Sequence, residues 1–219
     1  MRKKALVVWG GWEGHTPKES AELFTAFLRD SEYDVEVSQT LDSYLDKDKM
    51  NSLNLVVPVW TCGQITREQE MGLLQAVRSG VGIGGWHGCM CDSFRNNTEY
   101  QFMTGGQWVV HPGGVIPSYR VNIIKPDDEI VKGLDDFMMT NTEQYYMHAD
   151  PSNEVLATTT FSGDYEGIDW IRGNKMPVVW KRMFGKGRVF YTSLGHTVKD
   201  FDVPQAREIV KRGLLWASQ

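Results

Sequence analysis

The first ninety residues alternate short, mainly apolar runs with amphipathic segments, and this order constrains the fold more than any other feature of the chain. ALVVWG (5–10), LNLVVPVW (53–60) and VGIGGW (81–86) have the composition of strands that are buried on both faces of a sheet. YDVEVSQ (33–39) alternates apolar and polar residues, as an edge or half-covered strand does. With helices in the connections, the pattern β-α-β-β-α-β predicts a doubly wound, mainly parallel sheet.

Four segments have the pattern of helices. The first two begin with capping residues, Thr16 before a proline and Thr66 before Arg-Glu-Gln-Glu. We expect helices from residue 17 to about 30, from 66 to 80, over 91–105 and over 203–218.

The second half of the chain has a different composition. From about residue 107 it is rich in strand-forming residues and interrupted by glycine and proline, which predicts further strands, some of them antiparallel, inserted beside the sheet. Residues 177–195 are predicted to form a hairpin around Gly185-Lys-Gly187, with the second arm returning to the sheet. No repeat or linker interrupts the chain, so we expect a single domain over residues 1–219.

Composition excludes several classes of function. The net charge is −5 and the longest basic run is Arg2-Lys3-Lys4, which argues against nucleic acid as a partner. No apolar stretch reaches the roughly 18 residues that span a membrane, and Met1 is not followed by a leader sequence, so we expect a cytoplasmic protein. The three cysteines, Cys62, Cys89 and Cys91, fit a reducing compartment and are expected to be buried or half-buried.

Residues 85–89, Gly-Trp-His-Gly-Cys, match the pattern of a nucleophile elbow, the sharp turn that joins a strand to a helix. Small residues at both ends of the pattern allow the backbone to fold tightly around an exposed central side chain. Here the central residue is His87. We expect it at the carboxyl end of the sheet, where open α/β folds bind their ligands.

The other four histidines also lie close to predicted strands. His15 follows the first strand and His196 follows the last, so both are expected at the same edge of the sheet as His87. His111 and His148 belong to the β-rich insertion, and either could fold over this edge. The sequence therefore predicts that imidazoles gather at one site.

Two kinds of chemistry fit such a site. One is a divalent metal such as zinc, held by His87 and His196 with His15, His111 or His148 as a further ligand. The other is acid–base catalysis by a histidine with Glu143, which gives His87, Glu143 and His196 catalytic roles. We expect no nucleotide cofactor.

Seven stretches carry a family resemblance over nearly the whole chain: VVWGGWEGHTPxE, VWTCGQIT, GIGGWHG, FRNNTEYQFMTGGQWVVHPGG, TEQYYMHADP, MPVVWKRMFGKGRVFYTSLGH and RGLLWA. In these motifs the chain resembles the ThuA-like, or trehalose-utilisation, family. The resemblance implies a flavodoxin-like three-layer α/β sandwich, similar to class I glutamine amidotransferases. It also implies a role in using trehalose and related disaccharides, including oxidised (keto) sugars, with a small-molecule sugar as the ligand.

Two positions depart from the amidotransferase pattern. That family has a cysteine nucleophile at the elbow, where this chain has His87, and a glutamate two residues after the late histidine, where this chain has Val198. Imidazole cannot replace a thiolate in forming the thioester, so glutamine hydrolysis through Cys62 or Cys89 is disfavoured.

Aromatic residues favour a sugar site. Trp12, Trp60 and Trp86 lie at or beside strand ends, and Tyr145 and Tyr146 could form a wall, although such rings also serve as core packing. Exposed aromatics near the insertion also suggest a homo-oligomer. Two functions stay open: an enzyme acting on a sugar with a metal or a histidine, and a non-catalytic sugar-binding or regulatory module on the same scaffold.

Overall fold

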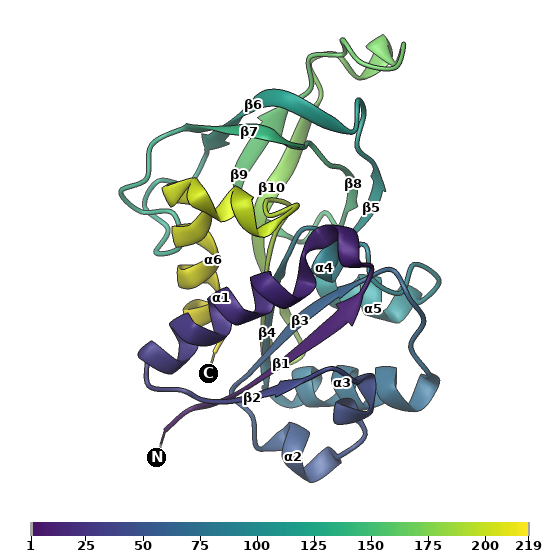
Figure 1. Cartoon of the computed structure of the whole chain (residues 1–219), viewed down its shortest axis with the longest axis vertical. Coiled ribbons are helices and arrows are strands. Elements are labelled where there is room, and N and C mark those ends of the chain that lie inside the picture. Colours follow the sequence, from purple (N-terminus) through teal and green to yellow (C-terminus); the bar gives the residue numbers. More distant parts are fainter. Residues whose placement is uncertain (1, 219) are drawn as a thin grey trace.

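The computed structural model describes residues 2–218, and one nine-stranded sheet runs through them. The strand order is β2-β1-β3-β4-β11-β10-β9-β6-β7, in which the first five strands are parallel and the rest antiparallel. In Figure 1 the strands β1 to β4 lie in the lower half of the molecule and β6, β7 and β9 in the upper half. The order of the parallel part is that of flavodoxin-like folds, which confirms the predicted fold class.

The strands of the main sheet are β1 (Lys4–Gly11), β2 (Asp34–Ser38), β3 (Leu55–Thr61), β4 (Gly82–Trp86), β6 (Val115–Ile123), β7 (Phe137–Glu143), β9 (Glu154–Thr160), β10 (Lys175–Phe184) and β11 (Gly187–Thr192). A separate antiparallel pair joins β5 (Gly106–Val110) and β8 (Tyr146–Ala149). The hairpin β10–β11 turns at Gly185-Lys186, and its second arm returns to the sheet as predicted, where it pairs with β4 in parallel.

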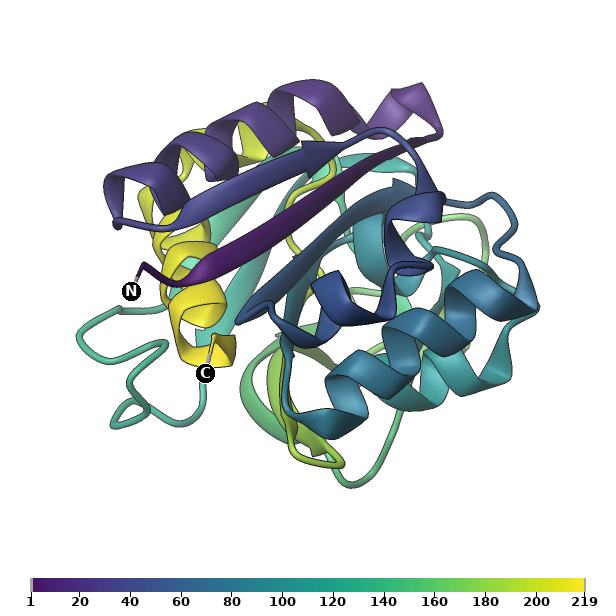
Figure 2. The same cartoon turned by 90° about the horizontal axis from the view of Figure 1, so that it is seen from below.

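Helices cover the parallel strands on both faces. The helices are α1 (Pro17–Asp30), α2 (Lys47–Asn51), α3 (Arg67–Ser79), α4 (Gly88–Cys91), α5 (Thr98–Thr104) and α6 (Pro204–Ala217). Seen from below, α1 (purple) and α6 (yellow) lie on one side of the strands, and α3 and α5 (blue to teal) lie on the other (Figure 2). Among the described residues, no helix is both long and apolar enough to cross a membrane.

The two faces of β1 show why an uninterrupted apolar run forms a central strand. Ala5 and Val7 join the core that α1 and α6 complete, whereas Leu6 and Val8 join the core beneath α3. Since neighbouring side chains of a strand point to opposite faces, a strand that is covered on both faces needs apolar residues at every position.

The prediction of one helix over residues 91–105 is wrong. The structure has a single turn, α4, then an irregular segment, then α5. Phe94 takes a positive φ of 48° and Ser93 pairs with Cys62 of the neighbouring strand end, so the backbone cannot continue as a helix there. The interruption moves Asp92 and Arg95 off a helix surface and toward the ends of the strands.

Candidate functional site

His87 occupies the turn between β4 and α4, and its backbone is strained. Its φ is 47° and its ψ is −144°, a conformation that side chains other than glycine rarely adopt. The turn is fixed by two bonds to β11: the His87 amide donates to the Thr192 carbonyl at 2.6 Å, and the Tyr191 hydroxyl donates to the His87 carbonyl at 3.0 Å. The elbow predicted from the sequence is therefore present, with an imidazole in the place of a nucleophile.

Gly88 explains why the elbow pattern needs a small residue after its centre. A Cβ atom at this position would lie 2.4 Å from Cε1 of His15 and 3.0 Å from the Tyr145 hydroxyl. Only glycine leaves room for these two side chains beside His87.

Three imidazoles from the ends of different strands come together at this point. The ring centroids of His15 and His87 are 4.7 Å apart, those of His15 and His196 are 5.3 Å apart, and those of His87 and His196 are 5.4 Å apart. Because β1, β4 and β11 run in parallel, the residues that follow them share one edge of the sheet. The structure thus brings together the histidines that the strand order predicts.

Glu143, the last residue of β7, lies in the middle of this group. Its Oε2 atom is 3.5 Å from Nε2 of His87, and its Oε1 atom is 3.4 Å from Nε2 of His196 and 3.7 Å from Nε2 of His111. We call the five residues His15, His87, His111, Glu143 and His196 the histidine cluster.

Several polar atoms of the cluster are buried without a hydrogen-bond partner among the described residues. Both ring nitrogens of His87 are in this state, as are Oε2 of Glu143 and Nδ1 of His111. Unpaired buried polar atoms are costly, so a metal ion, a ligand or ordered water bound here would relieve that cost.

Neighbouring residues orient the cluster. Nδ1 of His15 bonds to the Thr61 hydroxyl at 2.9 Å, which leaves Nε2 of that ring for another partner. The backbone amide of His196 donates to Oδ2 of Asp200 at 2.9 Å, and the same oxygen accepts from the Thr142 hydroxyl at 2.6 Å. Asp200 therefore ties the His196 loop to the strand that carries Glu143.

Burial controls the charge of these groups. It lowers the pKa of His15 to about 3 and that of His87 well below its usual value, and the neighbouring imidazoles lower both further. Burial also lowers the pKa of His196 and raises the pKa of Glu143, although the nearby His111 opposes the rise. The lowered pKa values favour the uncharged form of His15, His87 and His196 at neutral pH, which is the state in which imidazole binds metals.

A pocket of about 220 Å³ opens beside the cluster. His15, His111 and Glu143 line it together with Trp12 and Tyr145. The Tyr145 ring lies against His87 with a centroid distance of 3.8 Å. Two of the predicted substrate-binding aromatics, Trp12 and Tyr145, are therefore placed at the pocket.

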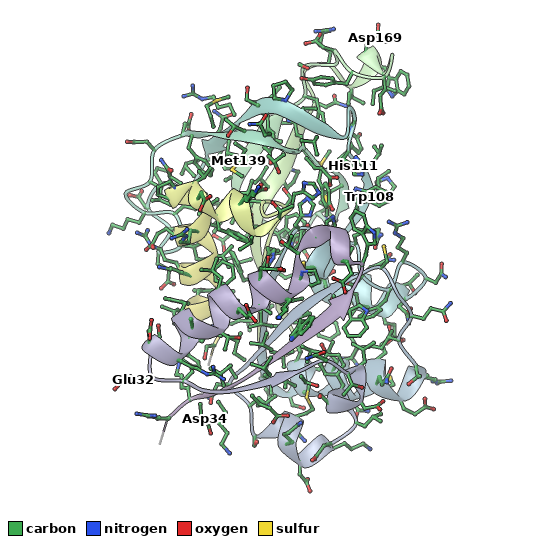
Figure 3. The ribbon with its side chains drawn as sticks, viewed as in Figure 1. Glu32, Asp34, Trp108, His111, Met139 and Asp169 are labelled. Carbon is green, nitrogen blue, oxygen red and sulfur yellow. The ribbon has the colours of Figure 1, made fainter. Side chains whose placement is uncertain are left out.

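Three further residues line the pocket that the sequence did not indicate, Asp92, Arg95 and Trp108, and Cys62 lies beside them in the lining. In Figure 3 Trp108 and His111 lie close together, and their ring centroids are 5.5 Å apart. Asp92 and Arg95 were not predicted at the site because a continuous helix was expected there. Their short distance in sequence from His87 at the elbow is nevertheless a signal that they could lie near the site.

Three predicted aromatics lie elsewhere. Trp86 is fully buried and packs on Phe24 and Phe201, so its expected contact with substrate is corrected to a role in the core. Trp60 is packed against the core beneath α3 and is not among the pocket-lining residues. Tyr146 packs against Phe161 in the same core and is not among the pocket-lining residues, whereas Tyr145, which precedes β8, lines the pocket.

His148 is also separate from the histidine cluster. It lies on β8 with its side chain exposed, whereas the preceding residue, Met147, is buried. Strand alternation points His148 to solvent, so its position gives no support to the expectation that it is a ligand.

The cysteines are poor candidates for nucleophiles. Cys89 and Cys91 are buried, and burial raises the pKa of the Cys89 thiol to about 12. Cys62 lines the pocket, but burial and the carboxylate of Asp92 raise its pKa. A raised pKa disfavours the reactive thiolate, in line with the expectation that glutamine hydrolysis is not the activity.

The buried histidines predict how the stability of the metal-free protein depends on pH. Folded His15 stays neutral down to about pH 3, whereas the unfolded chain binds a proton below about pH 6.5. Stability should therefore fall as the pH drops from about 6.5 toward 3, with roughly 2 kcal/mol lost at pH 5 through this residue. Glu143 acts in the opposite direction, because its raised pKa favours the folded state at low pH. Urea unfolding at pH 7.5 and pH 5, in the presence of a chelator, measures the net effect.

The variant His15→Gln should show a smaller difference in unfolding free energy between the two pH values than the wild type. Equal differences in the two proteins would contradict the assignment of this effect to His15.

The fold and the site define a flavodoxin-like α/β protein with a histidine and carboxylate cluster at the carboxyl ends of its parallel strands. A family model for ThuA, trehalose utilisation, matches residues 4–217, and the chain belongs to this family.

Solved structures with the same fold include two ThuA-like proteins. The protein from Bacteroides uniformis ATCC 8492 is 17% identical with a TM-score of 0.80, and the alignment covers 99% of this chain and 91% of that one. The protein from Parabacteroides merdae ATCC 43184 is 18% identical with a TM-score of 0.75, covering 99% and 90%. A cytoplasmic protein of Salmonella typhimurium LT2 is 11% identical with a TM-score of 0.67, covering 99% and 100%. No match is found among curated proteins.

Proposed function

We propose that the protein is an enzyme of disaccharide utilisation that acts on a sugar with the help of a divalent metal such as zinc, held by His15, His87 and Glu143. The observation that supports this most is the set of three buried side chains whose ligand atoms all lie within 4.8 Å of one another. In the same place, buried nitrogen and oxygen atoms have no other hydrogen-bond partner.

The separation between two of these ligand atoms suits one metal ion, and the third lies within 4.8 Å of both. Ligand atoms about 2.0 to 2.1 Å from a tetrahedral zinc lie roughly 3.3 to 3.5 Å from one another. Nε2 of His87 and Oε2 of Glu143 are 3.5 Å apart, which is long for a hydrogen bond but suited to two ligands of one ion. The bond from His15 to Thr61 is the kind of outer contact that orients a metal-binding imidazole.

When bound, such an ion would polarise a sugar carbonyl or lower the pKa of a water molecule, which is the chemistry that a keto sugar requires. Side chains of the protein would supply proton transfer and would orient the carboxylate of Glu143. His111 lies within 3.7 Å of Glu143, lines the pocket and is half-exposed, so it can exchange a proton with a ligand there. His196 contacts the same carboxylate oxygen and keeps it turned toward the cluster.

The pocket suits a sugar as the ligand. Trp12 is 53% exposed although it lines the pocket, and with Tyr145 it offers flat apolar surfaces for the C–H faces of a sugar ring. The family model, which describes trehalose utilisation, points to the same class of substrate.

Two measurements test the proposal. Calorimetric titration of the metal-stripped protein with zinc should show one site per chain, and the loaded protein should convert a keto disaccharide when products are followed by chromatography. Absence of zinc binding would remove the metal, and absence of turnover with intact sugar binding would leave only a binding protein.

A non-catalytic sugar-binding or regulatory module is the second candidate. It is favoured by the imidazole at the elbow, where a catalytic thiol would be needed for the amidotransferase reaction. Its signature is disaccharide binding without product after prolonged incubation. For either function we propose a cytoplasmic location and a homo-oligomeric state, which sedimentation velocity would measure.

A further inference from the structure

Arg95 is a firmly held polar group at the rim of the pocket. Its Nε donates to Oδ1 of Asp92 at 2.6 Å and its Nη2 donates to Oδ2 at 2.9 Å, a two-bond arrangement that fixes the plane of the guanidinium. The guanidinium carbon also lies 4.5 Å from the centroid of the Trp108 ring. The group is therefore held from two directions, although its side chain is 48% exposed.

This arrangement leaves N–H groups of the Arg95 guanidinium available to donate hydrogen bonds to a ligand. Within residues 2–218, Nη1 of Arg95 forms no hydrogen bond with the protein. Because the pair with Asp92 is rigid, little conformational entropy is lost when a ligand binds to the free donors.

The charges at the rim of the pocket favour a neutral ligand there. Asp92 is buried and compensates the charge of Arg95, so this pair adds no net charge to the rim. A phosphate or carboxylate would meet the Asp92 carboxylate at close range, whereas hydroxyl groups can accept from Arg95 and donate to Asp92 at once.

The size of the pocket limits the ligand. At about 220 Å³ it is smaller than the roughly 300 to 1,000 Å³ typical of sites for drug-sized ligands. The buried end is formed by His15, Glu143 and Tyr145, and the open end by Arg95 and Trp12. A single sugar ring fits between these ends, so the second ring of a disaccharide would extend past the rim.

We propose, building on the proposed function, that the pocket holds one pyranosyl ring of the sugar and that Arg95 recognises this ring, donating from Nη1 to its hydroxyls. The group attached to the ring lies outside the pocket and contributes little to recognition.

Calorimetric titrations of the full chain, loaded with zinc, test this inference. The probes are trehalose and methyl α-glucoside, which share one pyranosyl ring and differ in the attached group. We expect their dissociation constants to agree within about 5-fold. Arg95→Met should weaken the affinity for both sugars by about 10-fold to 100-fold. Arg95→Lys keeps the positive charge but loses the planar guanidinium with its several donors, and it should weaken the affinity by about 10-fold.

Arg172→Met is the matched control, because Arg172 pairs with Asp164 at 2.9 Å on a loop outside the pocket lining. This control should bind both sugars like the wild type, and Arg95→Met should keep wild-type affinity for zinc, which also reports that the variant is folded.

Each outcome has one meaning. Wild-type sugar affinity in Arg95→Met would overturn the role of Arg95, and methyl α-glucoside binding more than 100-fold weaker than trehalose would overturn the one-ring pocket. A wild-type protein that binds neither sugar would overturn this inference, whereas the proposed function fails separately if the protein neither binds zinc nor converts the keto disaccharide.

Discussion

Replacing Glu143 by glutamine should reduce the affinity for zinc by more than about 100-fold and abolish turnover of the sugar. The substitution keeps the shape of the side chain but removes the negative charge at the only carboxylate that the cluster contains. A neutral amide is a weak zinc ligand, and even changes in the residues that support a ligand cost about 10-fold to 100-fold. Calorimetric titration with zinc measures the loss directly.

The fold should survive this change. Burial raises the pKa of Glu143, so the ionised form is unfavourable in the metal-free protein, and glutamine removes that cost. We therefore expect the unfolding temperature of the metal-free variant to equal or exceed that of the wild type. His148→Gln is the matched control, since it changes a histidine that is exposed and outside the cluster. Zinc affinity in Glu143→Gln equal to that of the control would rule out Glu143 as a ligand.

The convergence of the histidines could be predicted because it follows from strand direction alone. His15, His87 and His196 each follow a strand of the parallel part, and parallel strands end at the same edge. The insertion could not be treated in this way. His111 and His148 are both near short strands of one antiparallel pair, yet only His111 reaches the cluster, because alternation and the turn after β5 decide the direction of each side chain.

The pocket-lining residues Asp92 and Arg95 could not be assigned from the local sequence pattern, because that pattern predicts a helix. Residues 91–105 have the composition of a helix, and nothing in their periodicity shows the positive φ of Phe94 or the pairing of Ser93 with Cys62. Contacts between segments far apart in the chain override the local preference there. Since Asp92 and Arg95 lie in this interrupted stretch, the only sequence signal for their place at the pocket is their short distance from the elbow at His87.

The aromatic residues show a further limit of sequence analysis. Trp12 and Trp86 both lie within two residues of the end of a central strand, but Trp12 is 53% exposed and Trp86 is fully buried. Whether a side chain on a strand is buried depends on the face of the sheet to which it points. The sequence does not say which helix covers that face, and here Phe24 of α1 lies against Trp86.

Trp86→Ala should therefore act on stability rather than on recognition of the sugar, and we expect it to lower the free energy of unfolding by about 3 to 5 kcal/mol. The ring centroid lies 4.6 Å from that of Phe24 and 5.8 Å from that of Phe201, so its removal leaves a cavity between β4, α1 and the loop before α6. For a chain of this length the unfolding temperature should fall by about 10 °C.

Two variants make this test specific. Trp86→Phe should cost much less, because it keeps most of the ring and removes an indole N–H that is buried without a partner among the described residues. Trp12→Ala changes an exposed ring, so its unfolding free energy should stay within about 0.5 kcal/mol of the wild type while its affinity for sugar falls. Equal loss of stability in Trp12→Ala and Trp86→Ala, measured by urea unfolding, would show that the division between a core ring and a pocket ring is wrong.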